Sequence, residues 1–145
     1  MSQAHVDLVL ALQPGPDVDL VPIVRDDAVS AAWTEGVGPY FHADFECAHR
    51  LLGGDRTCSG MAALRASWLA WLAPWATYRV EVEEAIDCGD RVLMLVHDFG
   101  RREGSSAEVK SHNAAIWTIR EGKVARAEFY ADRAWARKDA GLVLM

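Results

Sequence analysis

The spacing of apolar residues changes its period near Thr77, and this change limits the folds open to the chain. Upstream, in the segment 61–75, five large apolar residues recur at three- and four-residue steps, as in a helix: Leu64, Trp68, Trp71, Leu72 and Trp75. Downstream, apolar and polar residues alternate, with turn signals at "DCGD", "GRREGSSAE" and "REGK". Such a pattern is typical of a four-stranded antiparallel meander. Helices followed by a meander predict an α+β fold, with helices against one face of a bent sheet.

Two further segments precede this transition. Residues 17–37 have helical spacing interrupted at Pro22, and the stretch "FHADFECAHRL" reads as a short strand. Pro14, Gly15 and Pro16 break any earlier helix, so we expect residues 1–16 to be a loosely ordered N-terminal extension. A chain of 145 residues suits one domain with one core, spanning residues 1–145.

Charge and composition narrow the functional classes. A net charge of -6 disfavours nucleic acid as a partner, because phosphate binding needs a concentrated basic patch. The N-terminus lacks a basic region followed by a long apolar run, so we expect neither a signal peptide nor a membrane span. Three cysteines without a C-x-x-C pair indicate neither a disulfide framework nor a zinc site. These features favour a reduced, cytoplasmic protein.

Several motifs resemble one known family. The order of "FHADFE", an apolar helix after Gly60, "YRVEVEEAIDCGDRVLMLV" and "AAIWTIREGKVARAEFYADR" is similar to the SnoaL-like branch of the NTF2-like, ketosteroid-isomerase-like superfamily, over residues 17–142. The resemblance implies a cone, in which a curled antiparallel sheet wraps around helices and leaves an internal pocket. It also implies a homodimer. No G-x-G-x-x-G or Walker pattern occurs in the chain, so we expect no cofactor.

The last strand, "AEFYADR", presents a choice between two faces, because alternate side chains point to opposite sides of a sheet. A two-residue turn at Glu121-Gly122 would pair Ala115 with Glu128, Asn113 with Tyr130, and Ser111 with Asp132. In proteins of the resembling family, the position of Asp132 holds a carboxylate that points into the cavity. The resemblance therefore implies that Glu128, Tyr130 and Asp132 face the pocket, whereas Ala127, Phe129 and Ala131 face outward.

A carboxylate against apolar walls loses hydration, which raises its pKa from about 4 toward neutrality and suits it to proton exchange. Asp132 is the first candidate for this catalytic role, with Glu128 as its partner and Tyr130 as a hydrogen-bond donor to substrate. The alternative is that both carboxylates form salt bridges at the sheet rim, with cations at positions 123, 126 and 133.

His49 is the second catalytic candidate. It falls where ketosteroid isomerases carry a proton-shuttling carboxylate, and an imidazole pKa of about 6.5 suits proton abstraction next to a carbonyl. A surface or hydrogen-bonded histidine is the alternative. Ala115 departs from the family, because many SnoaL-like proteins have histidine there. Trp117, Tyr130 and Asn113 remain as donors to a substrate.

The preceding hairpin has a longer loop. Centring it on Gly104-Ser105 pairs His97 with His112, and it places Asp98 on the inner face as a further substrate-binding residue. Two histidines without a third ligand are a weak metal signal, so we expect no metal. The outer face would then be apolar enough to require a second subunit, through Leu93, Leu95, Phe99, Ala114, Ile116 and Phe129.

Two functions follow from these observations. The first is cofactor-independent acid–base catalysis on a small apolar carbonyl or epoxide-type ligand, by isomerisation, cyclisation, dehydration or hydrolysis. The alternative is a non-catalytic NTF2-like module that binds a ligand or dimerises. The fold cannot decide between them, because this fold hosts many functions.

Overall fold

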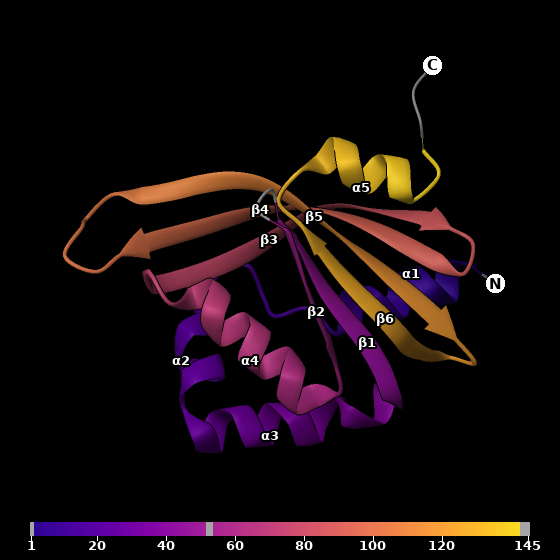
Figure 1. Ribbon diagram of the computed structural model, residues 1–145, viewed down its shortest axis with the longest axis horizontal. Helices are drawn as coiled ribbons and strands as arrows, with labels where there is room; N and C mark the ends of the chain where they lie inside the picture. Colours follow the sequence, from indigo (N-terminus) through magenta and orange to yellow (C-terminus); the bar gives the residue numbers. More distant parts are fainter. Residues whose placement is uncertain (1, 52–53, 143–145) are drawn as a thin grey trace.

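A computed structural model describes residues 2–51 and 54–142. Its centre is a six-stranded sheet of order β2-β1-β6-β5-β4-β3 (Figure 1). The strands are β1 (Phe41–Leu51), β2 (Gly54–Ser59), β3 (Trp75–Cys88), β4 (Arg91–Arg102), β5 (Glu108–Arg120) and β6 (Lys123–Tyr130). The helices are α1 (Ser2–Ala11), α2 (Leu20–Arg25), α3 (Asp27–Val37), α4 (Met61–Leu72) and α5 (Arg133–Asp139), with a 3₁₀ turn at Gly38–Tyr40.

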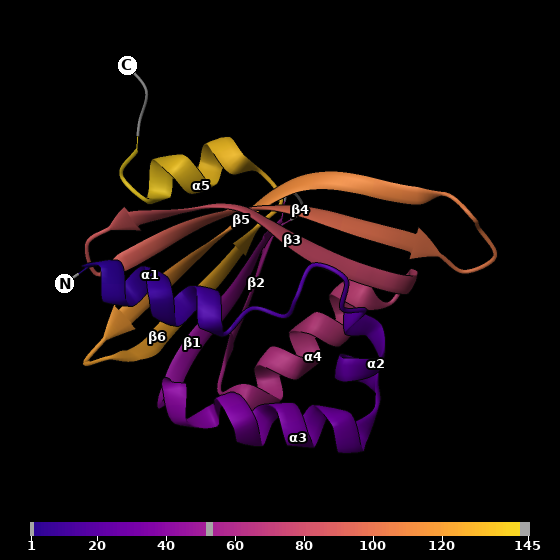
Figure 2. The same ribbon diagram turned by 180° about the vertical axis from the view of Figure 1, so that it is seen from behind.

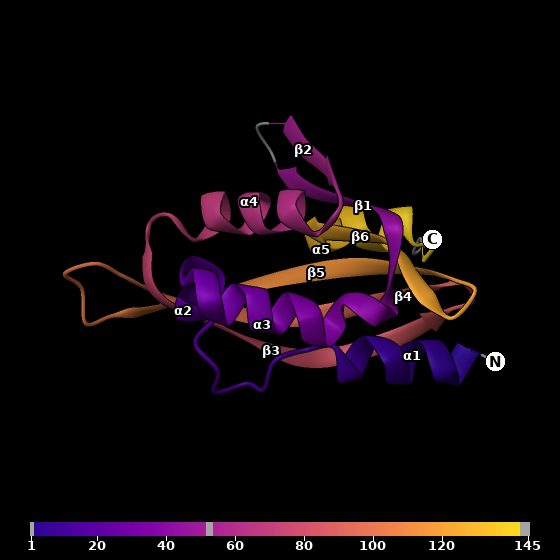
Figure 3. The same cartoon turned by 90° about the horizontal axis from the view of Figure 1, so that it is seen from below.

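The sheet curls, and helices lie on both of its faces. Helices α1 to α4 occupy the concave face, here called the inner face, and α5 lies on the opposite, outer face (Figures 1 and 3). The predicted α+β cone is therefore confirmed. One detail differs, because β1 pairs with β6 in parallel while the other four strand pairs are antiparallel. Helix α4 and four strands lie between β1 and β6 in the chain, so no tight turn forces these two strands to run in opposite directions.

The β5–β6 hairpin contains a bulge that changes every pairing beyond it. Its two-residue turn forms as predicted, and Arg120 pairs with Lys123. The register then shifts between Thr118 and Ile119, so that Ala115 lies opposite Phe129 instead of Glu128. A one-residue slip exchanges the two faces of a strand. The predicted orientation of β6 is thus wrong: Ala127 and Phe129 pack with the inner core, and Glu128 between them faces outward.

The outer face of the sheet is covered by the chain itself. Leu93, Leu95 and Ile116 are at most 1% exposed, and they pack with Ala136 and Ala140 at the C-terminal end. The prediction overlooked α5, and it placed Phe129 on the wrong face. The homodimer remains a prediction, but these apolar residues no longer support it.

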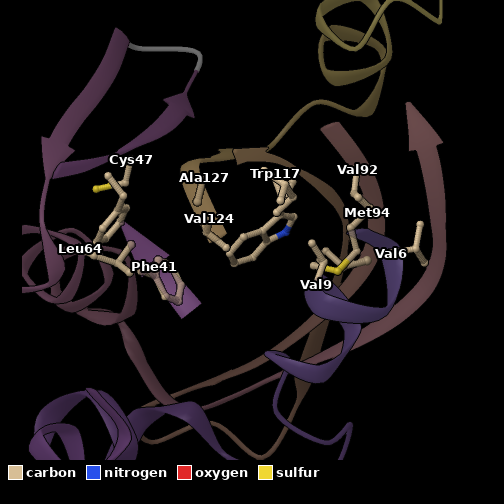
Figure 4. Packing of buried hydrophobic residues seen from close by; sticks show 14 residues of the cluster. Val6, Val9, Phe41, Cys47, Leu64, Val92, Met94, Trp117, Val124 and Ala127 are labelled. Carbon is tan, nitrogen blue, oxygen red and sulfur yellow. The ribbon is translucent and has the colours of Figure 1, made fainter. Parts of the chain in front are cut away.

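The N-terminal segment also differs from the expectation of a loose extension. Residues 2–11 form α1, and its Val6 and Val9 are buried against β3 and β4 (Figures 2 and 4). In Figure 4 they lie beside Val92 and Met94. The proline and glycine residues at 14–16 end the helix without preventing its packing. Within the described ranges, no helix combines the length and the apolarity of a membrane span.

Two of the three cysteines are joined. Cys47 on β1 lies opposite Cys58 on β2, and the structure links them by a disulfide. The sequence predicted no disulfide, because an eleven-residue separation does not reveal that two residues meet across a hairpin. Cys88 is free.

Candidate functional site

A cavity of about 480 Å³ lies between the inner face of the sheet and helices α2 to α4. Apolar side chains dominate its wall, among them Leu20, Trp33, Leu64, Trp68, Val80, Met94, Val96, Ala115, Trp117 and Phe129. Val18 and Trp33 line the cavity while each keeps 36% of its surface exposed, so they mark its rim. A cavity of this size and lining suits a small organic molecule with few polar groups.

One polar group in this wall is centred on Asp98 of β4. The side chain is 5% exposed and accepts a hydrogen bond from the hydroxyl of Tyr78, which lies on β3. The indole of Trp71 donates to the same hydroxyl oxygen over 2.9 Å. Burial raises the pKa of Asp98, and the bond from Tyr78 opposes that rise. Asn113, 8% exposed on the neighbouring β5, also lines the cavity.

A second polar group is centred on His49 of β1, which is 2% exposed. Its Nδ1 lies 2.5 Å from the hydroxyl of Ser67 on α4. Its ring stacks on Phe129 and Trp71, with ring centroids 4.9 and 5.7 Å away. Burial, followed by the nearby charge of Arg56, lowers the pKa of His49 to about 4. The imidazole is therefore neutral at pH 7.

Trp71 connects the two polar groups. One face of its indole meets the ring of His49, and its Nε1–H reaches Tyr78, which in turn bonds Asp98. A single side chain of α4 thus holds both groups against the cavity, one on β1 and the other on β3 and β4. Rigid support of this kind fixes polar atoms relative to one another.

Three buried polar atoms of the cavity-lining residues have no hydrogen-bond partner among the described residues: His49 Nε2, Asp98 Oδ1 and Trp117 Nε1. Buried polar atoms are normally paired, and each exception calls for a reason such as an absent ligand or solvent. A ligand with its own donors and acceptors would satisfy them.

The structure brings five of the predicted site residues into the cavity wall: His49, Asp98, Asn113, Ala115 and Trp117. Tyr130 also borders the cavity, but its hydroxyl donates to Asp139 of α5 over 2.7 Å. This hydroxyl therefore points to the outer face and is not a donor to a ligand in the cavity.

Glu128 does not reach the cavity. Its carboxylate accepts from Arg50 over 2.6 Å, and Arg126 lies 3.6 Å away. The bulge in β6 turned this side chain outward, so the predicted position of Glu128 in the pocket is wrong. Its salt bridge to Arg126 matches the alternative that the sequence left open.

Asp132 also lies outside the cavity. It is exposed and caps α5, because its Oδ1 accepts from the backbone N–H groups of Ala134 and Trp135 at 2.8 and 3.1 Å. An aspartate before a helix is a common N-cap, since it satisfies free N–H groups of the first turn. The predicted position of Asp132 in the pocket is therefore wrong.

This capping role has a measurable consequence. Asp132→Ala is expected to lower the free energy of unfolding by about 1 kcal/mol, because two N–H groups of α5 lose their acceptor. Asp132→Asn should stay within a few tenths of a kcal/mol of the wild type, because asparagine caps equally well. Urea denaturation of both variants measures the difference; equal stability of the alanine variant and the wild type would contradict the role.

Sequence reasoning missed three residues of the site, namely Tyr78, Ser67 and Trp71. Tyr78 had a signal, because alternation along β3 places it on the same face as Val80 and Val82. In the sequence, Trp71 is only one of the apolar residues whose spacing indicates a helix, and its ring packs against His49 as such a residue would. Nothing in the sequence indicated a role for Ser67, because a serine in the middle of an apolar helix shows no function until its partner, His49, is known.

The family of the chain follows from a sequence comparison. Residues 24–127 match the SnoaL-like domain, which is well over half of the chain. The chain belongs to the SnoaL-like family. No curated protein matches this SnoaL-like protein.

Solved structures share the fold of this SnoaL-like protein. TerC, crystallised with polyporic acid, is 21% identical with a TM-score of 0.63, covering 95% of this chain and 98% of its own. A protein from Jannaschia sp. CCS1, described as a SnoaL-like polyketide cyclase, is 17% identical with a TM-score of 0.67, covering 99% and 94%. A ketosteroid-isomerase-like protein from Catenulispora acidiphila DSM 44928, in complex with trimethylamine, is 16% identical with a TM-score of 0.57, covering 90% and 95%. At these identities the likeness concerns the fold.

Proposed function

We propose that this SnoaL-like protein is a cofactor-independent acid–base enzyme that acts on a small, largely apolar carbonyl compound. The observation that carries the proposal is the buried carboxyl of Asp98, which lines an apolar cavity and has one oxygen without a hydrogen-bond partner among residues 2–51 and 54–142. The description of a structural neighbour as a polyketide cyclase agrees with this class of reaction.

In the proposed reaction, Asp98 exchanges the proton. Burial raises its pKa, which brings the carboxyl closer to the working range of a general base at neutral pH. The free Oδ1 takes a proton from the carbon next to the substrate carbonyl, and the resulting enolate is protonated again from the same group. Tyr78 holds the other oxygen and so keeps the carboxyl in one orientation.

The enolate oxygen needs hydrogen-bond donors, and the cavity offers two atoms that have no partner in the described part of the chain: Trp117 Nε1–H and His49 Nε2. In the tautomer in which Nδ1 accepts from the hydroxyl of Ser67, a neutral His49 carries its proton on Nε2, and the proposal uses this tautomer. A pKa of about 4 makes His49 a poor base at pH 7 and leaves it a neutral donor. We therefore assign oxyanion stabilisation to His49, in place of the proton abstraction expected from the sequence.

Proton exchange can be tested without knowing the natural substrate. A panel of small apolar ketones is incubated with the protein in D₂O, and loss of the signal from the hydrogens next to the carbonyl is followed by proton NMR. Asp98→Asn should reduce the exchange rate about 100-fold or more, the typical loss when a general base is removed. Asp132→Asn is the matched control, because it removes an exposed carboxylate and retains the cap of α5; its rate should equal that of the wild type. Equal rates for Asp98→Asn and the wild type would refute the role of Asp98.

A second function is ligand binding without catalysis. Ala115 favours it, because this position in the cavity wall contributes no polar group. Four tryptophans line the cavity, so their fluorescence reports on bound ligand: Trp33, Trp68, Trp71 and Trp117. Ketones that change this fluorescence but exchange no hydrogen beyond the uncatalysed rate would support binding alone.

A further inference from the structure

A cluster of potential metal ligands lies on the outer face, on the other side of the sheet from the cavity. His97 of β4 and His112 of β5 are cross-strand partners, with ring centroids 4.7 Å apart. His97 Nε2 lies 2.5 Å from Oε1 of Glu83 on β3. One potential ligand atom from each of the three residues lies within 4.8 Å of the others.

A bulge in β3 supplies the third ligand. The register of β3 with β4 shifts between Val82 and Glu84, which leaves Glu83 as the extra residue of the strand. Bulges redirect side chains and are frequent next to functional sites. From the sequence alone, His97 and His112 had no third ligand; the bulge turns Glu83 toward them.

We propose that Glu83, His97 and His112 bind a divalent zinc ion. Two imidazole nitrogens and one carboxylate oxygen form a ligand set that zinc commonly uses, with the fourth position left to water. Ligand atoms around a tetrahedral zinc ion at its usual bond lengths are separated by about 3.4 Å. Side-chain rotations would form such a site, because the 2.5 Å contact between His97 and Glu83 must lengthen by about 0.9 Å while the remaining separations, at most 4.8 Å, shorten toward about 3.4 Å.

Two neighbouring groups affect this site. His97 Nδ1 is buried and has no partner in the part of the chain that the structure describes, so this ring is not fully satisfied by protein contacts. Arg133 donates to Glu83 over 3.2 Å and to the backbone oxygens of Val96 and Asn113. Its guanidinium competes with a cation for the carboxylate, so we expect Arg133 to weaken zinc binding.

Isothermal titration with Zn²⁺ tests the proposal, using untagged protein in a Cys88→Ser background to remove the free thiol. One ion should bind per chain. His97→Gln, His112→Gln and Glu83→Gln should each weaken binding tenfold or more, since the loss of even a group that only supports a ligand costs about 10- to 100-fold. Arg133→Gln should strengthen binding. Circular dichroism verifies that each variant is folded.

His42→Gln is the matched control, because His42 contacts Arg120 at the other end of β5 and should not affect zinc affinity. Co²⁺ in place of Zn²⁺ should give the visible absorption of a four-coordinate site, and His112→Gln should abolish it. No binding in the wild type, or equal weakening by His42→Gln and His112→Gln, would overturn the proposal. The result is independent of the cavity, because Asp98→Asn should leave zinc affinity unchanged.

Discussion

Ala136→Asp is expected to lower the free energy of unfolding by about 3 kcal/mol or more, the cost of an uncompensated buried charge. Ala136 has no exposed surface and packs from α5 onto Leu93, Leu95 and Ile116 of the outer face. A carboxylate placed there must either displace the helix from the sheet or remain among apolar side chains. Urea denaturation followed by circular dichroism measures the loss.

Ala134→Asp provides the control in the same helix. Ala134 is exposed in the first turn of α5, where a negative charge interacts favourably with the helix dipole. Its stability should be equal to or slightly above that of the wild type. If both aspartate variants lost the same free energy, the damage would come from the helix itself, and α5 would not be the cover of the outer face.

Acid is expected to weaken the fold through His49. Its pKa in the folded protein is about 4, against an unperturbed value of 6.5, so the folded state favours the neutral ring. This contribution to stability is complete above pH 6.5 and is lost as the pH falls toward 4. A difference of this size corresponds to about 3 kcal/mol at about 1.4 kcal/mol per pKa unit.

Other carboxylates titrate in the same range, so the measurement must be a difference. The free energy of unfolding of the wild type and of His49→Gln is compared from pH 7 to pH 4. Glutamine can still bond Ser67 but does not titrate, so the variant should lose about 3 kcal/mol less over this range. His42→Gln should follow the wild type. Parallel curves for His49→Gln and the wild type would show that the pKa of His49 is not depressed in the folded state.

Much of the fold could be predicted because it rests on local patterns. The change of period near Thr77 located α4 and the meander, and the loop centred on Gly104-Ser105 gave the observed pairing of His97 with His112. That pairing placed Asp98 on the inner face, where the structure has it. The spacing of apolar residues and the residues of the turns determine helices, strands and hairpin pairings, because these depend on segments of only a few tens of residues.

The remaining differences come from one overlooked helix and from two features that no local pattern encodes. The bulge in β6 depends on how β5 and β6 fit together, and it exchanges the faces of Glu128 and Phe129. The N-cap role of Asp132 requires that a helix begins at Arg133, which the sequence analysis did not anticipate. The network from Ser67 to Asp98 depends on Trp71 of α4, whose ring contacts His49 of β1 and whose Nε1–H donates to Tyr78 of β3. The bulge and the network are tertiary effects, whereas the cap is local and was missed because α5 itself was not predicted.

The parallel pairing of β1 with β6 has a consequence for the order in which the protein folds. His49 of β1 pairs with Phe129 of β6, so the two strands that meet at this wall of the cavity are separated by most of the chain. Contacts between distant segments form late, because a long loop must close before they stabilise anything. On a ribosome, β1 can pair with β2 early but must wait for β6 to emerge, so the inner surface of β1, with Phe45 and Cys47, lacks one of its two neighbour strands until then. We therefore expect the nascent chain to hold an incomplete core until synthesis is nearly finished, with the cavity closing as one of the last steps.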